Sequence, residues 1–333
     1  VRHRPVDRRA EQDRPHRRQS RADAAPELVA GTTAEDILYA FANKHDEIKE
    51  LLNCKLIYEP TIFKNRYYEF LPLVYHFMLM LKNGGKPVLF FEMKANAFHL
   101  WKNLNYLIPW IIDWYVNPNN QWWYNWLYKR HKLILVSSKE VYEYLLAKNT
   151  RLNIRHLALS LSDRYKITSN TCYEKKYDVI LIGRQNPVLK DFLDQYKKTH
   201  PDLTIFIPSK QELASRDGYL DSMKKSRIAL YATPGIDGGE KRTNGFSQVT
   251  PRFLEMVASG CNIIARYKTN ADTDYYELEK FCQSINTYEE FEKEMDKCRI
   301  KGPDMTFYSS YLKKHYTSKR VEELQVILNE IDW

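Results

Sequence analysis

The chain has 333 residues, of which 44% are hydrophobic and 14% aromatic, so it can bury enough apolar surface for two domains and is not a disordered protein. Its net charge is +9, and four of these charges come from residues 1–26, which carry eight arginines against four acidic residues. The charge left for the other 307 residues is mild, which favours an anionic ligand or membrane surface as partner.

Residues 1–26 show almost no apolar periodicity and no hydrophobic run, so they predict a disordered arginine-rich tail and not a secretory signal. A segment added for expression is the alternative. A nucleic-acid-binding arm is disfavoured because the chain has no basic recognition helix and no RNP-like strand. We therefore expect no nucleic-acid partner.

Five cysteines are scattered without a Cys-x-x-Cys pair, which predicts neither a disulfide framework nor a zinc site and favours a reducing cytoplasm. No apolar stretch reaches the roughly 18 residues of a spanning helix. We expect a cytoplasmic protein, either soluble or peripheral at the inner face of the membrane.

Strands and helices alternate through the first half of the chain. The predicted elements are a helix from Thr33 to about Leu52, a strand at CKLIYEP, a helix over 66–82, a strand over 87–91, a helix before IPWIIDWYV, a strand, Ser-Ser cap and helix in HKLILVSSKEVYEYLLAK, and a strand at IRHLALSL. A polar break follows at 162–174.

The alternation then restarts. The second half predicts strands at KKYDVILIG, DLTIFIP, SRIALYA and CNIIARY, a helix at VLKDFLDQYKKTH, and a last helix over 318–331. This order predicts the α/β class, with parallel sheets covered by helices. We expect two Rossmann-like domains, 27–165 and 166–317, that face each other across a cleft, with the terminal segment 318–333 packing back on the first.

Two local patterns indicate where a ligand binds in such a cleft. A buried strand ends at Gly183-Arg184, where glycine admits a close approach and arginine can pair with phosphate oxygens. A plain turn glycine beside a solvated arginine is the alternative.

The second pattern is the stretch TNGFSQVTPRFLEMVASGCNIIARY. Thr250-Pro251 predicts a helix start whose N–H groups and positive dipole end form a phosphate seat. Arg252 with Lys241 or Arg242 would add positive charge, and Glu255, one turn on, would accept sugar or ribose hydroxyls. A capped helix with an internal ion pair is the alternative.

TPRFLEMVASGCNIIARY and the Gly-Arg pair resemble the donor domain of GT-B glycosyltransferases of the group-1 and CgeB-like kind, over roughly 175–290. The resemblance implies a nucleoside-diphosphate-sugar donor, with Glu255 on the ribose and Thr250, Pro251 and Arg252 at the diphosphate. It also implies that Gly183 belongs to the donor site, that Arg184 and either Lys241 or Arg242 neutralise the leaving group, and that neither a metal nor a separate cofactor is needed.

The chain departs from the family pattern at one informative position. Many retaining members carry a glutamate eight residues before the ribose-binding one, and Ser247 stands there in this sequence. Whether transfer retains or inverts the sugar configuration therefore stays open. A final proline of the pattern is replaced by Asn262.

The first domain should bind the acceptor. Glu59, Glu92 and Asp113 follow apolar runs and are candidates for a general base, as are His76 and His99. The stretch WYVNPNNQWWYNWLYKR, 114–130, could stack on sugars, rest on a membrane that holds a lipid-linked acceptor, or fill a core.

The sequence thus favours a glycosyltransferase that moves a sugar, of hexosyl type, from a nucleoside-diphosphate-sugar to a glycan or lipid-linked acceptor. A bacterial role in surface polysaccharide or glycolipid assembly fits this activity. The alternative is a non-catalytic nucleotide- or glycan-binding module on the same fold, for which the missing glutamate leaves room. A dehydrogenase is disfavoured because no G-x-G-x-x-G follows a strand.

Overall fold

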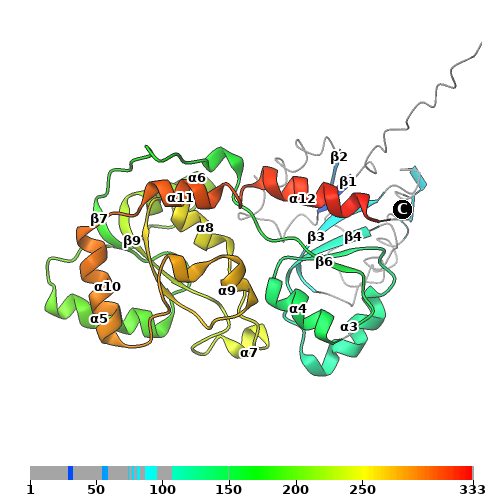
Figure 1. Cartoon of the computed structure of the whole chain (residues 1–333), viewed down its shortest axis with the longest axis horizontal. Coiled ribbons are helices and arrows are strands. Elements are labelled where there is room, and N and C mark those ends of the chain that lie inside the picture. The colour runs from blue at the N-terminus through cyan, green and yellow to red at the C-terminus, as the bar shows by residue number, and fades with distance from the viewer. Residues whose placement is uncertain are drawn as a thin grey trace, which may run out of the picture.

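The structure, a computed structural model, describes residues 29–32, 55–58, 74, 77–78, 81–82, 87–95, 107–148 and 150–331. These residues form two α/β halves that lie side by side, and the last helix, α12 (Thr317–Asn329), runs from the second half onto the first (Figure 1). Among the described residues, no helix has the length and apolar character needed to cross a bilayer.

The first half is built on a six-stranded parallel sheet in the order β2-β1-β3-β4-β5-β6. Its strands are β1 (Val29–Thr32), β2 (Lys55–Tyr58), β3 (Val88–Lys94), β4 (Leu107–Asp113), β5 (Ile134–Val136) and β6 (Ile154–His156). The four strands predicted in this half are confirmed as β2, β3, β5 and β6, although β6 covers only three residues of IRHLALSL. β4 lies in IPWIIDWYV, which was not named as a strand, and β1 was not predicted. The predicted helix over 33–52 and the one before β4 lie outside the described residues.

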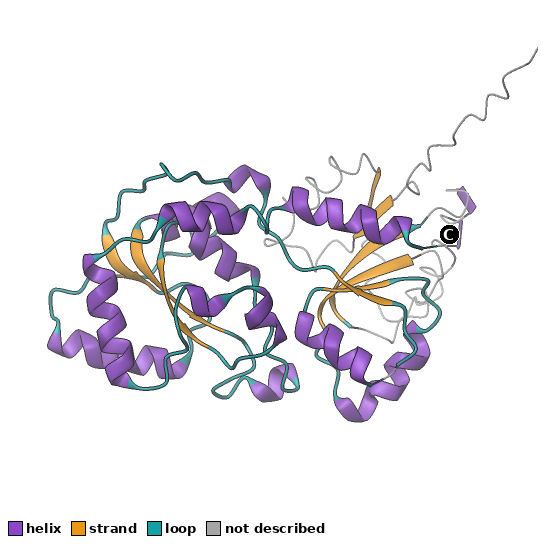
Figure 2. Ribbon diagram, in the orientation of Figure 1, coloured by secondary structure: helices purple, strands orange, loops and turns teal. Residues whose placement is uncertain are grey.

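Alternating side chains let this sheet pack on both faces, since successive residues of a strand point to opposite sides. Leu135 on β5 packs with Val321, Leu324 and Leu328 of α12. Its neighbour Ile134 packs on the other face, against α3 (Gln121–Tyr128) and α4 (Lys139–Ala147). The sheet is therefore the middle of three layers (Figure 2).

The second half holds a four-stranded parallel sheet in the order β10-β9-β7-β8. Its strands are β7 (Tyr177–Ile180), β8 (Ile205–Phe206), β9 (Ser226–Ala232) and β10 (Asn262–Arg266), and its helices are α5 (Pro187–Thr199), α6 (Arg216–Lys224), α7 (Glu240–Thr243), α8 (Pro251–Ala258), α9 (Ala271–Tyr275), α10 (Tyr288–Ile300) and α11 (Met305–Leu312). Every strand predicted here is confirmed, as are the helices at α5 and α12.

The predicted helix over 66–82 is described at five positions. Val74, Phe77, Met78, Leu81 and Lys82 are helical, and all five side chains are exposed. The apolar stripe that predicted this helix is therefore not buried at these positions.

The chain crosses between the halves twice, in two segments that lie side by side. Leu161 donates its N–H to His315 O (2.9 Å), and Thr317 donates its N–H to Leu161 O (2.9 Å). Ser318 then donates its N–H and hydroxyl to the Asp163 carboxylate, both at 2.7 Å. These bonds fix the position at which α12 leaves the second half.

Truncating Leu324 tests whether α12 is part of the first core. Leu324 is 1% exposed, whereas Val326 on the same helix is 59% exposed. We expect Leu324→Ala to lower the free energy of unfolding by about 3 kcal/mol, because it leaves a cavity in packed apolar surroundings. Val326→Ala, the matched control, should change it by less than about 0.5 kcal/mol. If urea denaturation shows the same loss of free energy of unfolding for both variants, the packing of α12 on the core of the first half is contradicted.

Candidate functional site

A cavity between the two halves lies where strands of both sheets end. It has a volume of about 520 Å³. The first half lines it with Asp113, the last residue of β4, and with Tyr115, which follows that strand by two residues. The second half contributes the loops after β7 and β9, residues 184–187 and 232–239, together with the start of α8. Carboxyl ends of parallel strands are the usual ligand position in open α/β folds.

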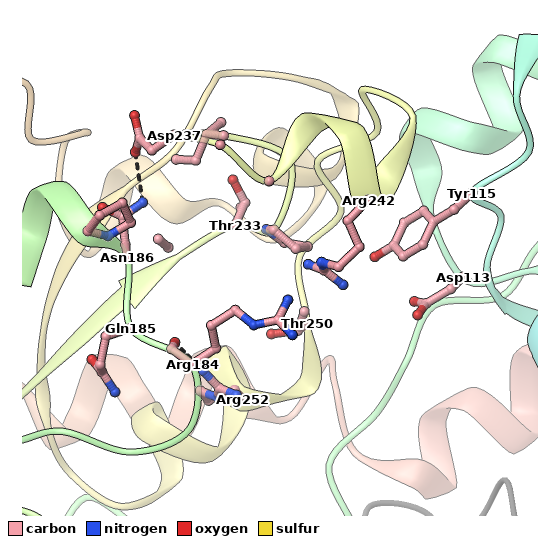
Figure 3. A pocket seen from close by; sticks show the side chains of 16 residues that line it. Asp113, Tyr115, Arg184, Gln185, Asn186, Thr233, Asp237, Arg242, Thr250 and Arg252 are labelled. Carbon is pink, nitrogen blue, oxygen red and sulfur yellow. Dashed lines mark hydrogen bonds between the residues drawn. The ribbon is translucent and has the colours of Figure 1, made fainter.

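Three arginines give this cavity a positive wall. Arg184, Arg242 and Arg252 line it, and none of the three forms an ion pair within the described ranges. Figure 3 shows Arg184 and Arg252 side by side, with Arg242 between them and Tyr115. The guanidinium of Arg242 lies 5.9 Å from the centre of the Tyr115 ring, a cation–π contact that links the two halves.

Gly183 allows this clustering. Its φ is +69°, and an added Cβ would lie 2.5 Å from the Nη2 atom of Arg252. Only glycine combines this backbone conformation with such a close approach. Arg252 in turn donates from Nη1 to the Arg184 carbonyl at 3.5 Å, so the two arginines hold the same loop.

Helix α8 begins at the cavity wall as predicted, with Thr250 at the N-cap position and Pro251 at the first helical position. The expected cap differs in detail, because the Thr250 side chain accepts no hydrogen bond from the first turn. Its backbone N–H instead donates to the Tyr231 hydroxyl (3.0 Å). No side-chain cap thus competes for the positive end of the helix dipole, which faces the cavity.

The loop after β9 is held by a paired carboxylate. Asp237, at φ +49°, accepts two bonds from Arg266, at 2.7 and 2.9 Å, and one from the Asn186 amide at 2.7 Å. The Arg266 bonds lower the pKa of Asp237. Because Arg266 neutralises this carboxylate, the arginine wall keeps its net positive charge.

Asp113 lies between this cavity and a second one and lines both. Burial raises the pKa of its carboxyl, while hydrogen bonds from Tyr115 and Gln248 and the charges of Lys94 and Arg242 oppose that rise. The Gln248 amide donates to Oδ1 at 2.7 Å, and Gln248 Oε1 is buried without a hydrogen-bond partner in the described part of the chain. A polar side chain of the second half thus orients a carboxylate of the first.

The second cavity has a volume of about 380 Å³ and more apolar walls, which come from both halves. Its lining includes Met93, Ile112, Leu159, Leu213, Tyr219 and Pro251. Glu255 lies at its edge, where its Oε1 atom pairs with Arg216 at the start of α6. The alternative of an ion pair within α8 is therefore not what the structure shows at Glu255, which pairs with a residue of another helix, Arg216 of α6.

The two halves are joined beside the first cavity by hydrogen bonds at the start of α4. The buried Asp272 carboxylate of α9 accepts bonds from the Ser138 hydroxyl and from the Lys139 N–H (2.8 Å). Glu140 accepts the Ser247 N–H at 2.7 Å, and Asn244 donates to the Tyr115 carbonyl at 2.6 Å. These contacts set the spacing of the cavity walls.

The remaining predicted residues lie elsewhere. Ser247 is buried behind the first cavity, where its hydroxyl donates to Thr233, a lining residue (2.7 Å). Lys241 is exposed on α7 beside the lining residue Arg242. Glu92 is buried and accepts the Tyr128 hydroxyl at 2.7 Å, away from both cavities. Glu59, His76 and His99 lie outside the described residues.

Tyr115, Asn186, Asp237, Gln248 and Arg216 belong to the site but were not among the residues predicted for it. Tyr115 and Asn186 each follow a predicted residue by two positions. Their place just after an apolar, strand-like run is therefore the sequence signal that could have identified them. Asp237, Gln248 and Arg216 act through tertiary contacts and left no such signal. No group of three or more His, Cys, Asp or Glu within the described ranges could hold a metal ion.

No protein-family model and no curated sequence matches the chain. Among solved structures, a glycosyltransferase from Rickettsia africae ESF-5 is similar over 92% of this chain and 99% of that chain, with TM-score 0.57 and 12% identity. AviGT4, a glycosyltransferase of avilamycin A biosynthesis, is similar over 92% and 97%, with TM-score 0.53 and 9% identity. UDP-GlcNAc 2-epimerase from Neisseria meningitidis bound to UDP-GlcNAc is similar over 91% of this chain and 99% of that chain, with TM-score 0.52 and 10% identity.

At such identities these likenesses establish the fold. The chain has the two-domain α/β fold of GT-B type that glycosyltransferases and these epimerases share, which confirms the predicted fold class. The CgeB-like assignment stays a prediction.

Asp272 predicts a pH dependence of stability. Burial raises the pKa of its carboxyl to about 7. Between the unfolded pKa near 4 and this value the folded state binds the extra proton, so stability should fall as pH rises, by up to about 1.4 kcal/mol per pH unit. We expect the stability of the wild type relative to Asp272→Asn to decrease between pH 4 and pH 7 and to level off above.

Urea denaturation of both proteins across that range measures the difference between their free energies of unfolding. The contributions of the other titrating groups cancel in this difference. Asp274→Asn, an exposed substitution on the same helix, is the control and should show no such trend. A difference that stays constant with pH would contradict a buried carboxylate between the halves.

Proposed function

We propose that the protein is a glycosyltransferase that uses a nucleoside-diphosphate-sugar. The observation that carries this proposal is the convergence of three arginines without ion-pair partners in the described chain on the start of α8, at the border of a polar and an apolar cavity. A diphosphate is the ligand that suits this border, because its negative charge suits both the arginines and the positive end of the α8 dipole.

The nucleoside would then occupy the second cavity. Its apolar walls and the Tyr219 ring suit a flat base, and Glu255 lies where a ribose would follow the diphosphate. Because Arg216 contacts Oε1 of Glu255, ribose hydroxyls would donate to the other carboxylate oxygen. The sugar would extend into the first cavity, toward Thr233, Asp237 and the arginine wall.

Asp113 is the group best placed to act on an acceptor. It belongs to the first half, borders both cavities, and has a pKa raised by burial, which brings a carboxylate closer to the strength that a general base needs at neutral pH. In an inverting reaction Asp113 would take the proton of the acceptor hydroxyl as that oxygen attacks the anomeric carbon and the nucleoside diphosphate leaves. The arginines would stabilise the charge on the departing diphosphate.

This proposal includes transfer of hexosyl type without a bound metal, to a glycan or lipid-linked acceptor of bacterial surface polysaccharide or glycolipid, in the cytoplasm. The second candidate is a non-catalytic module that binds a nucleotide or glycan, favoured by Ser247 at the position of the family glutamate. The two candidates share the ligand site and differ in turnover.

Nucleotide binding is tested first, by thermal-shift titration with UDP, GDP, dTDP, CMP and ADP. A nucleotide at one hundred times its dissociation constant should stabilise the fold by about 2.7 kcal/mol. We expect one nucleoside diphosphate to raise the midpoint of the wild type. Arg184→Ala, which removes an exposed side chain from the cavity wall, and Glu255→Gln, which keeps a partner for Arg216, should both weaken the effect.

Arg227→Ala is the matched control, because Arg227 is exposed on β9 and lines neither cavity. It should respond to the nucleotide as the wild type does. If no nucleotide raises the midpoint at millimolar concentration, the donor site is misassigned.

Turnover separates the two candidates. With the sugar donor of the nucleotide that binds, we expect the wild type to transfer or slowly hydrolyse the sugar, and Asp113→Asn to lower kcat by about 10²- to 10⁴-fold while keeping its nucleotide shift. Mass analysis of the sugar product measures this transfer or hydrolysis, and the proton NMR spectrum of the donor would reveal an epimerised sugar, which has the same mass. Binding without any turnover would support the non-catalytic module, and equal kcat in both proteins would exclude Asp113 as the base.

A further inference from the structure

Helix α3 carries an exposed ridge of tryptophans on the first half. Trp122 is 69% exposed and Trp126 is 44% exposed, one helical turn apart. Trp123 stacks on Trp126 with ring centres 5.1 Å apart and meets Trp122 edge-on at 5.7 Å. Large aromatic side chains that expose this much surface are the kind of patch that marks an interaction site.

The opposite side of the same helix is fixed in the core. Leu127 and Tyr128 are buried, and the buried Trp114 donates from Nε1 to Gln121 Oε1 at 3.5 Å. The Tyr128 hydroxyl donates to the buried Glu92 carboxylate. The ridge is therefore presented by an anchored helix, so an occupant would not have to order it first.

The charged residues on α3 and in the segments that flank it in the chain have one sign. No Asp or Glu occurs between residues 114 and 139, whereas Lys129 and Arg130 follow the tryptophans on the exposed side of the helix end. The Arg130 guanidinium lies 5.6 Å from the Trp126 ring centre. Tryptophans flanked by cations suit the boundary of an anionic bilayer, where the rings enter the headgroup layer and the cations meet lipid phosphates.

We propose that the Trp122–Arg130 face of α3 docks the protein on an anionic membrane surface. Trp122 projects from the outer side of the helix, a shape that can insert between headgroups. Residue 115, which lines the first cavity, is separated from α3 by only five residues. Docking would thus hold the half that carries Tyr115 at the bilayer surface, where, if the proposed transferase function holds, an acceptor with a lipid anchor is found.

Vesicle binding tests the proposal with the full chain. We expect the wild type to cosediment with vesicles of phosphatidylcholine containing one third phosphatidylglycerol, to bind much less to phosphatidylcholine alone, and to lose binding as salt rises. Lipids brominated near the headgroup should quench its tryptophan fluorescence. The double variant Trp122→Ala, Trp126→Ala should bind at least tenfold more weakly and lose this quenching.

Two further variants sharpen the result. Lys129→Glu combined with Arg130→Glu should weaken binding more than tenfold, because each cation near such a surface contributes about fivefold. The control Leu146→Ala, Ile300→Ala removes two exposed apolar side chains elsewhere and should bind as the wild type does. Thermal midpoints should agree among all these proteins, since every substituted side chain is exposed.

Absence of binding to anionic vesicles, or equal binding by wild type and the tryptophan variant, would overturn the proposal. A dimer that forms with rising concentration and disappears in the tryptophan variant, without vesicle binding, would assign the ridge to a second copy of the chain instead. Neither outcome depends on nucleotide binding, so docking and the proposed transferase function fail separately.

Discussion

Asp272 places a buried carboxylate at the N-terminus of α4, where a hydroxyl and a backbone N–H of the other half donate to it. A carboxylate is favourable at a helix N-terminus because it meets the unpaired N–H groups and the positive dipole end. Burial opposes its ionisation and raises its pKa. This bond and the Glu140–Ser247 bond beside it hold the two sheets at the spacing that both cavities require.

The site is a consequence of that spacing. Each wall by itself is incomplete, since the first half supplies Asp113 and Tyr115 while the second supplies the arginines and the start of α8. Gln248 crosses between them, from the second half to the Asp113 carboxylate. A change in the angle between the halves would therefore alter the orientation of Asp113 and the width of the cavity at the same time.

The local pattern of the chain was sufficient for most elements of the fold. Buried parallel strands such as β9 and β10 have continuous apolar runs, and α5 begins at an Asn-Pro pair that its sequence displays. β1 was missed because its four residues, VAGT, include a glycine and too few apolar positions to show a period. The apolar stripe at 74–81 predicted a helix, and the described positions are helical and exposed, since periodicity defines a face without specifying what covers it.

The sequence by itself determined the α/β class, the two sheets, the Gly183-Arg184 turn and the helix start at Thr250-Pro251, because each depends on residues adjacent in the chain. Only the tertiary structure decided which side chains share a cavity. It placed Asp113, and not Glu92, in the lining of the two cavities, paired Glu255 with Arg216, and exposed the tryptophans of α3. These outcomes depend on contacts between segments far apart in the chain, and such contacts leave no periodic or local signal in the amino-acid order.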